Sequence, residues 1–150
     1  MELNKVVADL DFVKAIVHNV EANCRMTSIS NDTKKEFGMD IKCNTPYIVD
    51  KRKIGKLLLQ IDISVKQDDN DLEADTFAFV VEGVFSSDAS IEDDRFLELL
   101  NINGGAALYS IARAKIEAMS SLIYSEGKLL LPMINIIQYY QERFATESED

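Results

Sequence analysis

A long helical pattern between Gly105 and Tyr124 most constrains how this chain of 150 residues can fold. On a helical wheel its polar side chains, such as Arg113 and Glu117, lie opposite a wide apolar stripe. We predict one long helix that must bury this stripe against another layer of structure. The stripe consists of Leu108, Ile111, Ala112, Ile116, Met119, Leu122 and Ile123.

Four stretches before this helix alternate between apolar and polar residues, which is typical of half-buried β-strands. In the first stretch His18 shares the apolar face, so we expect a buried, hydrogen-bonded histidine. Consecutive strands joined by polar turns favour an antiparallel meander. The four stretches are residues 16–26, 39–44, 57–66 and 76–85.

The connector between the last strand and the long helix, residues 90–103, is too apolar for an ordinary surface loop. Its apolar residues cover either the protein's own core or a bound partner, and a short helix at residues 94–100 is one option. A final helix is predicted from Asn135 to Phe144. The fold class is therefore α+β, with a four-stranded antiparallel meander, a connector and two helices.

Composition indicates a single globular domain spanning residues 1–150, since 47% of residues are hydrophobic and 28% are charged. We expect residues 1–14 to form an arm or short helix, and residues 145–150 to form a disordered acidic tail. The net charge of −10 disfavours nucleic acid as a partner. Because no secretory leader or membrane-spanning run is recognisable, we expect a cytoplasmic protein without membrane insertion.

The chain has no recognisable set of catalytic residues. It contains no glycine-rich phosphate loop and no Gly-x-Ser-x-Gly motif. Cys24, Cys43 and the single His18 form neither a disulfide framework nor zinc-ligand spacing. We therefore expect a protein that is not an enzyme and needs no cofactor and no metal.

Four short motifs follow one another in the second half of the chain: Glu-Gly-Val-Phe-Ser at residues 82–86, Leu-Leu-Asn at 99–101, Ala-Arg at 112–113 and Leu-Pro-Met-Ile-Asn at 131–135. In order and spacing they resemble the SecB protein-export chaperones. That family ends its last strand with a Gly-hydrophobic-Phe run and has an Ala-Arg pair early in its long helix. The resemblance covers roughly residues 15–144.

The resemblance implies a SecB-like holdase chaperone that works without ATP and binds unfolded polypeptides in an apolar groove. It implies that the connector is a crossover connection that forms one wall of this groove. It also implies a role in protein export, with the translocase motor ATPase as a further partner. The residues implied to bind clients are Phe77, Phe79, Val81, Phe85, Ile91, Phe96, Leu97, Leu99, Leu100, Ile102, Ile136, Ile137 and Tyr140.

Assembly is the next implication of the resemblance. The family assembles through its helices, which implies a homotetramer here, with the apolar stripe of the long helix as the oligomer interface. A stripe this wide, in a chain already rich in apolar residues, agrees with a covered surface.

Two features depart from the family. The positions that dock the export motor fall near Asn19, Asn23, Thr76 and Ala78, which carry no charge. The C-terminal tail is acidic, whereas the family has a positively charged one. The sequence therefore supports the chaperone fold more than delivery to the motor. A toxin–antitoxin-linked or phage-linked chaperone, and an adaptor or assembly module with one dedicated partner, stay open.

Overall fold

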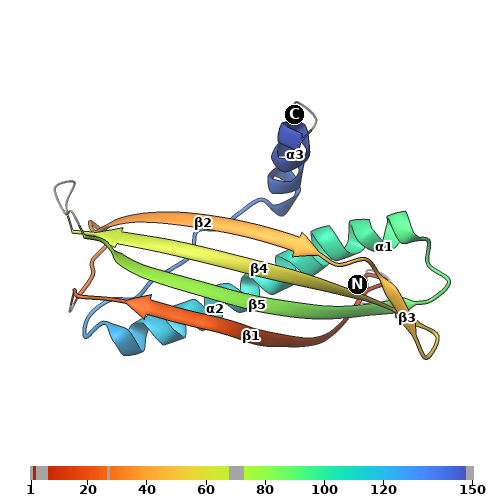
Figure 1. Ribbon diagram of the computed structural model, residues 1–150, viewed down its shortest axis with the longest axis horizontal. Helices are drawn as coiled ribbons and strands as arrows, with labels where there is room; N and C mark the ends of the chain where they lie inside the picture. The colour runs from red at the N-terminus through yellow and green to blue at the C-terminus, as the bar shows by residue number, and fades with distance from the viewer. Residues whose placement is uncertain (1, 3–6, 27, 68–72, 148–150) are drawn as a thin grey trace.

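One antiparallel sheet of five strands forms the body of the protein in the computed structural model, which describes residues 2, 7–26, 28–67 and 73–147. Figure 1 shows the long strands side by side along the molecule, with α1 and α2 on one side of them. The predicted α+β class with an antiparallel sheet is confirmed. The strands are β1 (Asp11–Asn23), β2 (Lys34–Cys43), β3 (Tyr47–Val49), β4 (Arg52–Lys66) and β5 (Asp75–Asp88).

The helices follow the sheet, and the connector contains one of its own. A π-helical turn, Leu100–Gly104, continues the connector helix into the long helix without a break. An irregular segment, residues 124–135, then leads to the final helix. The helices are α1 (Asp93–Leu99), α2 (Gly105–Ile123) and α3 (Ile136–Glu147).

The order of the strands across the sheet is β1-β5-β4-β2, which differs from the predicted meander. β2, β4 and β5 are neighbours as expected, but β1 pairs with β5 at the edge opposite β2. The connection from β1 to β2 passes the end of α2, where Ile29 is buried and its amide donates to the Glu126 carbonyl at 3.0 Å. Alternation specifies the two faces of a strand and not its partner, which explains the difference.

A short hairpin accounts for the fifth strand. After Pro46, β3 turns back onto β4 through Asp50 and Lys51, whose φ angles are 47° and 63°. Two consecutive residues with positive φ form the kind of two-residue turn that matches the twist of a hairpin. A strand of three residues is too short for its alternation to stand out in the sequence.

A bulge in β1 places His18 on a different face from the predicted one. The pairing with β5 shifts register at this residue, and such a shift reverses the alternation of the strand. His18 therefore lies exposed on the sheet face opposite the helices, with Nε2 3.8 Å from Oε2 of Glu82. The prediction of a buried histidine is wrong, because it carried a strict period of two through the bulge.

The core lies between the sheet, α1, α2 and the segment that follows α2. Along β4 the odd-numbered residues from Leu57 to Val65 are buried, and the even-numbered residues point to the other face. Leu108, Ala112 and Ile116 of α2 are fully buried against this surface. The centre of the predicted apolar stripe is thus covered by the protein's own sheet.

The two ends of the chain differ from the predicted arm and tail. β1 begins at Asp11, so only the residues before it can form an arm, and of these the structure describes residues 2 and 7–10. α3 extends to Glu147, so the predicted tail begins within a helix, and residues 148–150 lie outside the described part of the chain. Figure 1 shows α3 beyond the β2 edge of the sheet, and Arg143 of α3 donates to the Ile41 carbonyl of β2.

Candidate functional site

The β5 residues that were predicted to bind clients face α2. Phe77, Phe79, Val81 and Phe85 are each at most 2% exposed, and Tyr140 of α3 is also buried. The odd-numbered side chains of β5 point to the helical side of the sheet, where α2 crosses β4 and β5. In this structure the helix that follows these residues in the sequence covers them.

The connector is also part of the core for most of its length. Phe96 and Leu100 are fully buried and pack directly against Gly55 of β4. A Cβ added to this glycine would lie 2.8 Å from each of the two side chains. Leu99 is buried as well, so these three residues cover the protein's own core. Three other predicted client residues are partly buried, namely Ile91, Leu97 and Ile102.

A hollow beside α2 offers apolar side chains that are open to solvent. Two side chains of α2 hold the segment that follows the helix: Tyr109 Oη donates to the Pro132 carbonyl at 2.5 Å, and Arg113 Nε donates to the Leu131 carbonyl at 2.8 Å. Leu131 itself is buried, so the segment is fixed at a set distance from the helix. The hollow has a volume of about 400 Å³. We call it the α2 groove, and it is lined by Ala106, Tyr109, Ser110, Arg113, Ala114, Glu117, Met133, Ile134 and Ile136.

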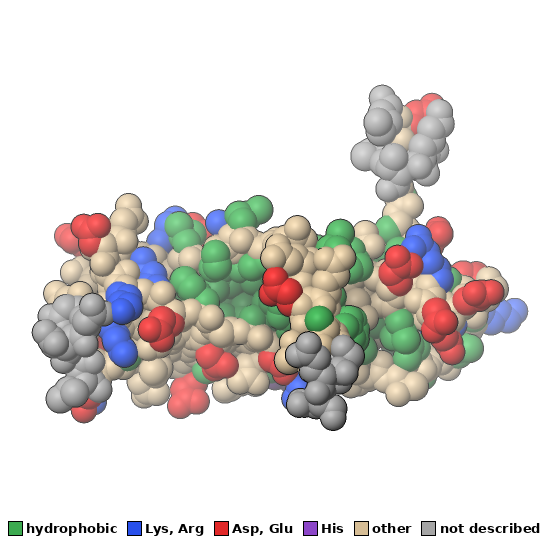
Figure 2. All heavy atoms as spheres, turned by 90° about the horizontal axis from the view of Figure 1, so that it is seen from above, with side chains coloured by type: hydrophobic (Ala, Val, Ile, Leu, Met, Phe, Trp, Pro, Cys, Tyr) green, Lys and Arg blue, Asp and Glu red, His purple; other side chains and the backbone are tan. Residues whose placement is uncertain are grey.

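The walls of the α2 groove combine small and large apolar groups. Ala106 and Ala114 are exposed on α2, so a bound chain can approach the helix closely. Met133 on the opposite wall is 83% exposed, and its flexible thioether can adapt to partners of different shape. Ile136, a predicted client residue, shares this wall, and its neighbour Ile137 is exposed on α3. Figure 2 shows hydrophobic side chains exposed on either side of the part of the chain that ends at the C-terminus.

Charged and polar groups lie at the rim of the α2 groove. Lys128 donates a hydrogen bond to Glu117, which lowers the pKa of the Glu117 carboxyl. Burial raises the pKa of the Tyr109 phenol, so this group stays a neutral donor to the segment backbone. The arrangement suits a polypeptide, which brings apolar side chains and backbone polar groups together.

The sequence did not identify Tyr109, Arg113 or Met133 as groove residues. The helical wheel assigns Arg113 to the polar side of α2, and nothing in the period of 3.6 residues indicates that a later segment returns to that side. The available signal was an apolar run interrupted by Pro132, because proline in such a run favours an extended segment over a helix.

The stripe that was predicted to form the oligomer interface is divided by the fold. Its central residues, Leu108, Ala112 and Ile116, are buried against the sheet. Ile111 and Met119 lie on the flanks and are partly buried. Leu122 and Ile123, near the end of α2, are exposed, and Leu122 is 87% exposed. A second copy of the chain can therefore reach only the exposed and partly buried residues of the stripe. β1, at the edge of the sheet, adds exposed apolar side chains at Phe12, Val13, Ile16, Val17 and Val20.

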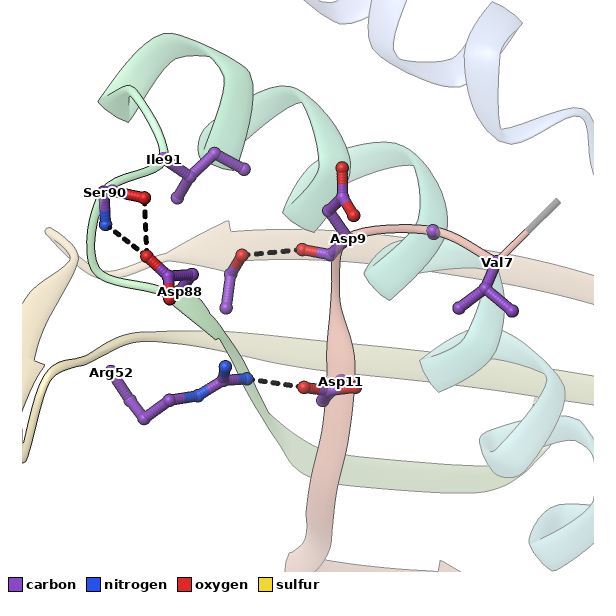
Figure 3. Close-up of a pocket in the computed structure, with 9 residues that line it drawn as sticks. Val7, Asp9, Asp11, Arg52, Asp88, Ser90 and Ile91 are labelled. Atoms are coloured by element: carbon purple, nitrogen blue, oxygen red, sulfur yellow. Dashed lines mark hydrogen bonds and ion pairs between the residues drawn. The ribbon is translucent and has the colours of Figure 1, made fainter. Parts of the chain in front are cut away.

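A second hollow, of about 510 Å³, lies where the residues before β1 pass the end of the sheet (Figure 3). Its polar groups are already bonded within the protein. Arg52 Nη2 donates to Asp11 Oδ2 at 2.5 Å, and Ser87 Oγ donates to the Asp9 carbonyl at 2.7 Å. The first bond ties β4 to the start of β1, and the second fastens the chain before β1 to β5, which gives the hollow a structural role.

Two further observations concern the described residues alone. Among them, no group of three or more His, Cys, Asp or Glu side chains is arranged to hold a metal ion. None of the helices in this part of the chain has the length and apolar character needed to cross a membrane.

Comparison with known proteins identifies the fold. No protein-family model matches the chain, and no curated protein matches it. A protein of unknown function from Streptococcus agalactiae gives a TM-score of 0.49 at 9% identity, over 83% of this chain and 97% of that chain. The chain is also similar to Rv1957, a SecB-like chaperone from Mycobacterium tuberculosis solved in complex with a ChAD peptide from the Rv1956 HigA1 antitoxin. This second likeness has a TM-score of 0.66 at 9% identity and covers 88% of this chain and 95% of that chain. The predicted resemblance is thus confirmed at the level of the fold: the chain folds as a SecB-like chaperone does.

Proposed function

We propose that this protein is an ATP-independent holdase chaperone that binds non-native polypeptides in the α2 groove. The observation that carries the proposal is the groove itself, a hollow of about 400 Å³ with an exposed methionine on one wall and exposed alanines on the other. Non-native chains expose apolar side chains, and burying them in such a hollow is favourable without sequence specificity. The fold supports the proposal, because Rv1957 has the same fold and was solved with a bound peptide.

The proposed client surface differs in part from the set that the resemblance implies. It keeps Ile136 and Ile137 and adds Met133, which is more exposed than either. Ile102 extends the surface from the π-helical turn, which α3 contacts. Ile91 and Leu97, both partly buried on the connector, also stay in the proposed set.

Removing apolar surface from the groove should weaken client binding without changing stability. Met133→Ser and Ala114→Asp alter exposed positions, so we expect both variants to fold as the parent does. Affinity for a chemically reduced, unfolded client should fall on the order of tenfold for each, as for a side chain at a binding hot spot. The matched control is Ile48→Ser, which removes an exposed apolar side chain on β3, outside the groove.

Client affinity, aggregation suppression and thermal unfolding should be measured for the parent, the two groove variants and the control. These measurements show whether clients bind in the α2 groove. If the control loses as much affinity as the groove variants, binding follows total apolar surface and the groove is not the site. If none of the variants loses affinity, the proposal fails.

A dedicated adaptor is a second candidate function. It is favoured by the complex of Rv1957, in which the bound peptide comes from one particular antitoxin. A toxin–antitoxin-linked or phage-linked chaperone would work in this way. Breadth of binding separates the two functions: a holdase suppresses the aggregation of several unrelated reduced proteins, whereas an adaptor suppresses none of them.

We also propose that the protein assembles into a homotetramer in the cytoplasm. Leu122 and Ile123 at the end of α2, and the apolar side chains of β1, are accessible surfaces that a second copy could cover. Multi-angle light scattering that gives a stable monomer at micromolar concentration would contradict this. Delivery of clients to the translocase motor ATPase, which the resemblance also implies, is tested by direct binding to the purified motor.

A further inference from the structure

The face of the sheet opposite the helices, which we call the open face, has an uneven distribution of charge. The even-numbered residues of β4 point to it, and their partners on β1, β5 and β2 extend each of them into a row across the sheet. In Figure 1 α1 and α2 lie on the other side of the strands. The open face is therefore separate from the α2 groove.

The half of the open face next to β3 combines lysines with apolar side chains. The β3 hairpin adds Tyr47, which pairs with Ile54 at the end of this half. Two rows lie beside it, Lys14–Val84–Lys56 and Ile16–Glu82–Leu58–Lys42. We call the accessible members of this half the basic patch. It consists of the exposed residues Lys14, Ile16, Lys42, Tyr47 and Leu58 and the half-buried Lys56.

Nζ of Lys42 lies 3.6 Å from Oδ2 of Asp40, and the Lys42 side chain is 71% exposed, so its ammonium group still faces solvent. The other two lysines of the basic patch are available to a partner. Lys14 and Lys56 form no ion pair with any residue that the structure describes, and Nζ of Lys56 lies 5.8 Å from the centroid of the Tyr47 ring. Glu82 is the one carboxylate in the two rows, and its Oε2 lies 3.8 Å from Nε2 of His18. Tyr47 is 42% exposed and Leu58 is 38% exposed, so apolar surface lies between the ammonium groups.

The other half of the open face has the opposite character. Three of its rows contain four carboxylates and no lysine or arginine: Asn19–Val80–Gln60–Asp40, Glu21–Ala78–Asp62–Gly38 and Asn23–Thr76–Ser64–Glu36. The pair Lys34–Lys66 lies beyond these rows, at the far end of the face. The positions that the resemblance implies for docking of the export motor all fall in these rows. The basic patch is thus a separate surface, and it is positive although the net charge of the chain is −10.

We propose that the basic patch is a docking surface for an acidic partner protein, specifically for an extended segment in which carboxylates alternate with apolar side chains. Such a segment presents its carboxylates to Lys14, Lys42 and Lys56 and its apolar side chains to Tyr47 and Leu58. Complementary charge directs a partner to one patch and excludes partners of the wrong sign. This inference goes beyond the proposed function, because it concerns the face that the client surface does not use.

A short acidic segment fits the open face better than an anionic membrane does. A membrane is wide and flat, so it would also press against the half that contains Glu21, Glu36 and Asp62, and like charges would repel there. A segment only a few residues long contacts the basic patch alone.

Charge reversal of the patch, with a matched reversal elsewhere on the same face, tests the proposal. The probe is a fluorescein-labelled peptide of alternating Glu and Leu, and a peptide of alternating Lys and Leu is the specificity control. The test protein is the full chain with Lys14→Glu and Lys56→Glu. The control protein carries Lys34→Glu and Lys66→Glu, which pair with each other at the far end of the open face and give the same change in net charge.

Fluorescence anisotropy should report that reversal of the patch weakens binding of the Glu–Leu peptide on the order of tenfold or more. The control protein should bind the probe within about twofold of the parent, and added salt should weaken binding of the parent. Aggregation suppression by both proteins should equal that of the parent, so failure here is distinguishable from failure of the proposed client site.

Five results would overturn the proposal. Equal losses in both reversed proteins would mean that only net charge matters, and no loss in either would mean that the patch does not bind the peptide. Preference for the Lys–Leu peptide would reverse the assigned partner. Patch-dependent binding to phosphatidylserine vesicles without peptide binding, or a change of oligomeric state on patch reversal, would assign the patch to a membrane or to a second copy.

Discussion

The phenol oxygen of Tyr124 lies 3.2 Å from Oδ2 of Asp75, and both residues are buried. Asp75 also accepts hydrogen bonds from the backbone amides of Arg25 at 2.8 Å and Met26 at 3.3 Å. One carboxylate thus joins the end of α2, the chain after β1 and the start of β5. A buried carboxylate is stable only where donors surround it in this way.

Replacing this carboxylate should destabilise the fold strongly. Asp75→Ala leaves the Tyr124 hydroxyl and two backbone amides without their acceptor, so we expect the free energy of unfolding to fall by roughly 2–5 kcal/mol. Tyr124→Phe removes one donor and should cost about 1–2 kcal/mol. Urea denaturation measures both, with the exposed Asp62→Ala as control. Equal stability of Asp75→Ala and Asp62→Ala would contradict this account.

Tyr140 offers the opposite case. Its hydroxyl is buried and has no hydrogen-bond partner among the described residues. Tyr140→Phe removes a polar group that is desolvated without compensation, so stability should stay the same or rise by about 1 kcal/mol. The same urea titration, run beside Tyr124→Phe, gives the comparison. A loss as large as that of Tyr124→Phe would mean that the hydroxyl does have a partner in solution.

These two tyrosines should also limit stability at alkaline pH. Burial raises the pKa of the Tyr124 and Tyr140 phenols above their ordinary value of 10.0. The folded state therefore keeps its protons where the unfolded chain loses them. The resulting stabilisation is complete below pH 10.0 and is lost as the pH rises toward the folded pKa values.

The free energy of unfolding should thus be level up to about pH 9 and fall above about pH 10, by at most about 1.4 kcal/mol per pH unit for each tyrosine. Tyr140→Phe should reduce this slope. A slope that is unchanged in this variant would assign the alkaline loss to other groups.

Two glycines on neighbouring strands should respond differently to an added methyl group. At Gly55 the new Cβ would lie 2.8 Å from Phe96 and Leu100, so Gly55→Ala should destabilise by roughly 1–3 kcal/mol. At Gly38 the nearest atoms are at 3.8 Å, and Gly38→Ala should be neutral or slightly stabilising. Thermal unfolding of the pair checks this, and equal melting temperatures would refute the close packing of the connector on β4.

Truncation of the connector should affect stability and leave client affinity unchanged. Leu100 is fully buried, so Leu100→Ala should lower the free energy of unfolding by roughly 2–5 kcal/mol. Because the residue lies beneath the surface, affinity for a reduced client, expressed per folded molecule, should equal that of the parent. A stable variant with weakened client binding would instead place this residue on the client surface.

The sequence predicted well those elements whose environment is uniform along their length. The alternation from Leu57 to Val65 identified β4 and both of its faces, because one face meets the core throughout and the other meets solvent. Leu108, Ala112 and Ile116 identified the buried side of α2 for the same reason. Period alone is sufficient where one neighbour covers a whole element.

The parts that the sequence did not reveal depend on contacts between distant segments. The pairing of β1 with β5 and the bulge at His18 change partner and face without changing residue type. The α2 groove exists because Tyr109 and Arg113 bind the backbone of a later segment, and backbone acceptors have no sequence signature. The resemblance implied a client groove lined by Phe77 and Phe96, and both are buried here. Strong apolar character suits a core and a binding surface equally, so residue type alone does not separate the two.

The pairing of β1 with β5 also has a consequence for the order of events while the chain is made. Asp11 pairs with Ser86, so the first strand leaves the ribosome long before its partner exists. Until then its apolar side chains, among them Val17 and Val20, have no strand to pack beside. Closing so long a loop is slow compared with forming the β4–β5 hairpin, so β1 should join the sheet last. During part of synthesis β1 is therefore an unpaired apolar segment. The proposed clients of this protein expose segments of the same kind.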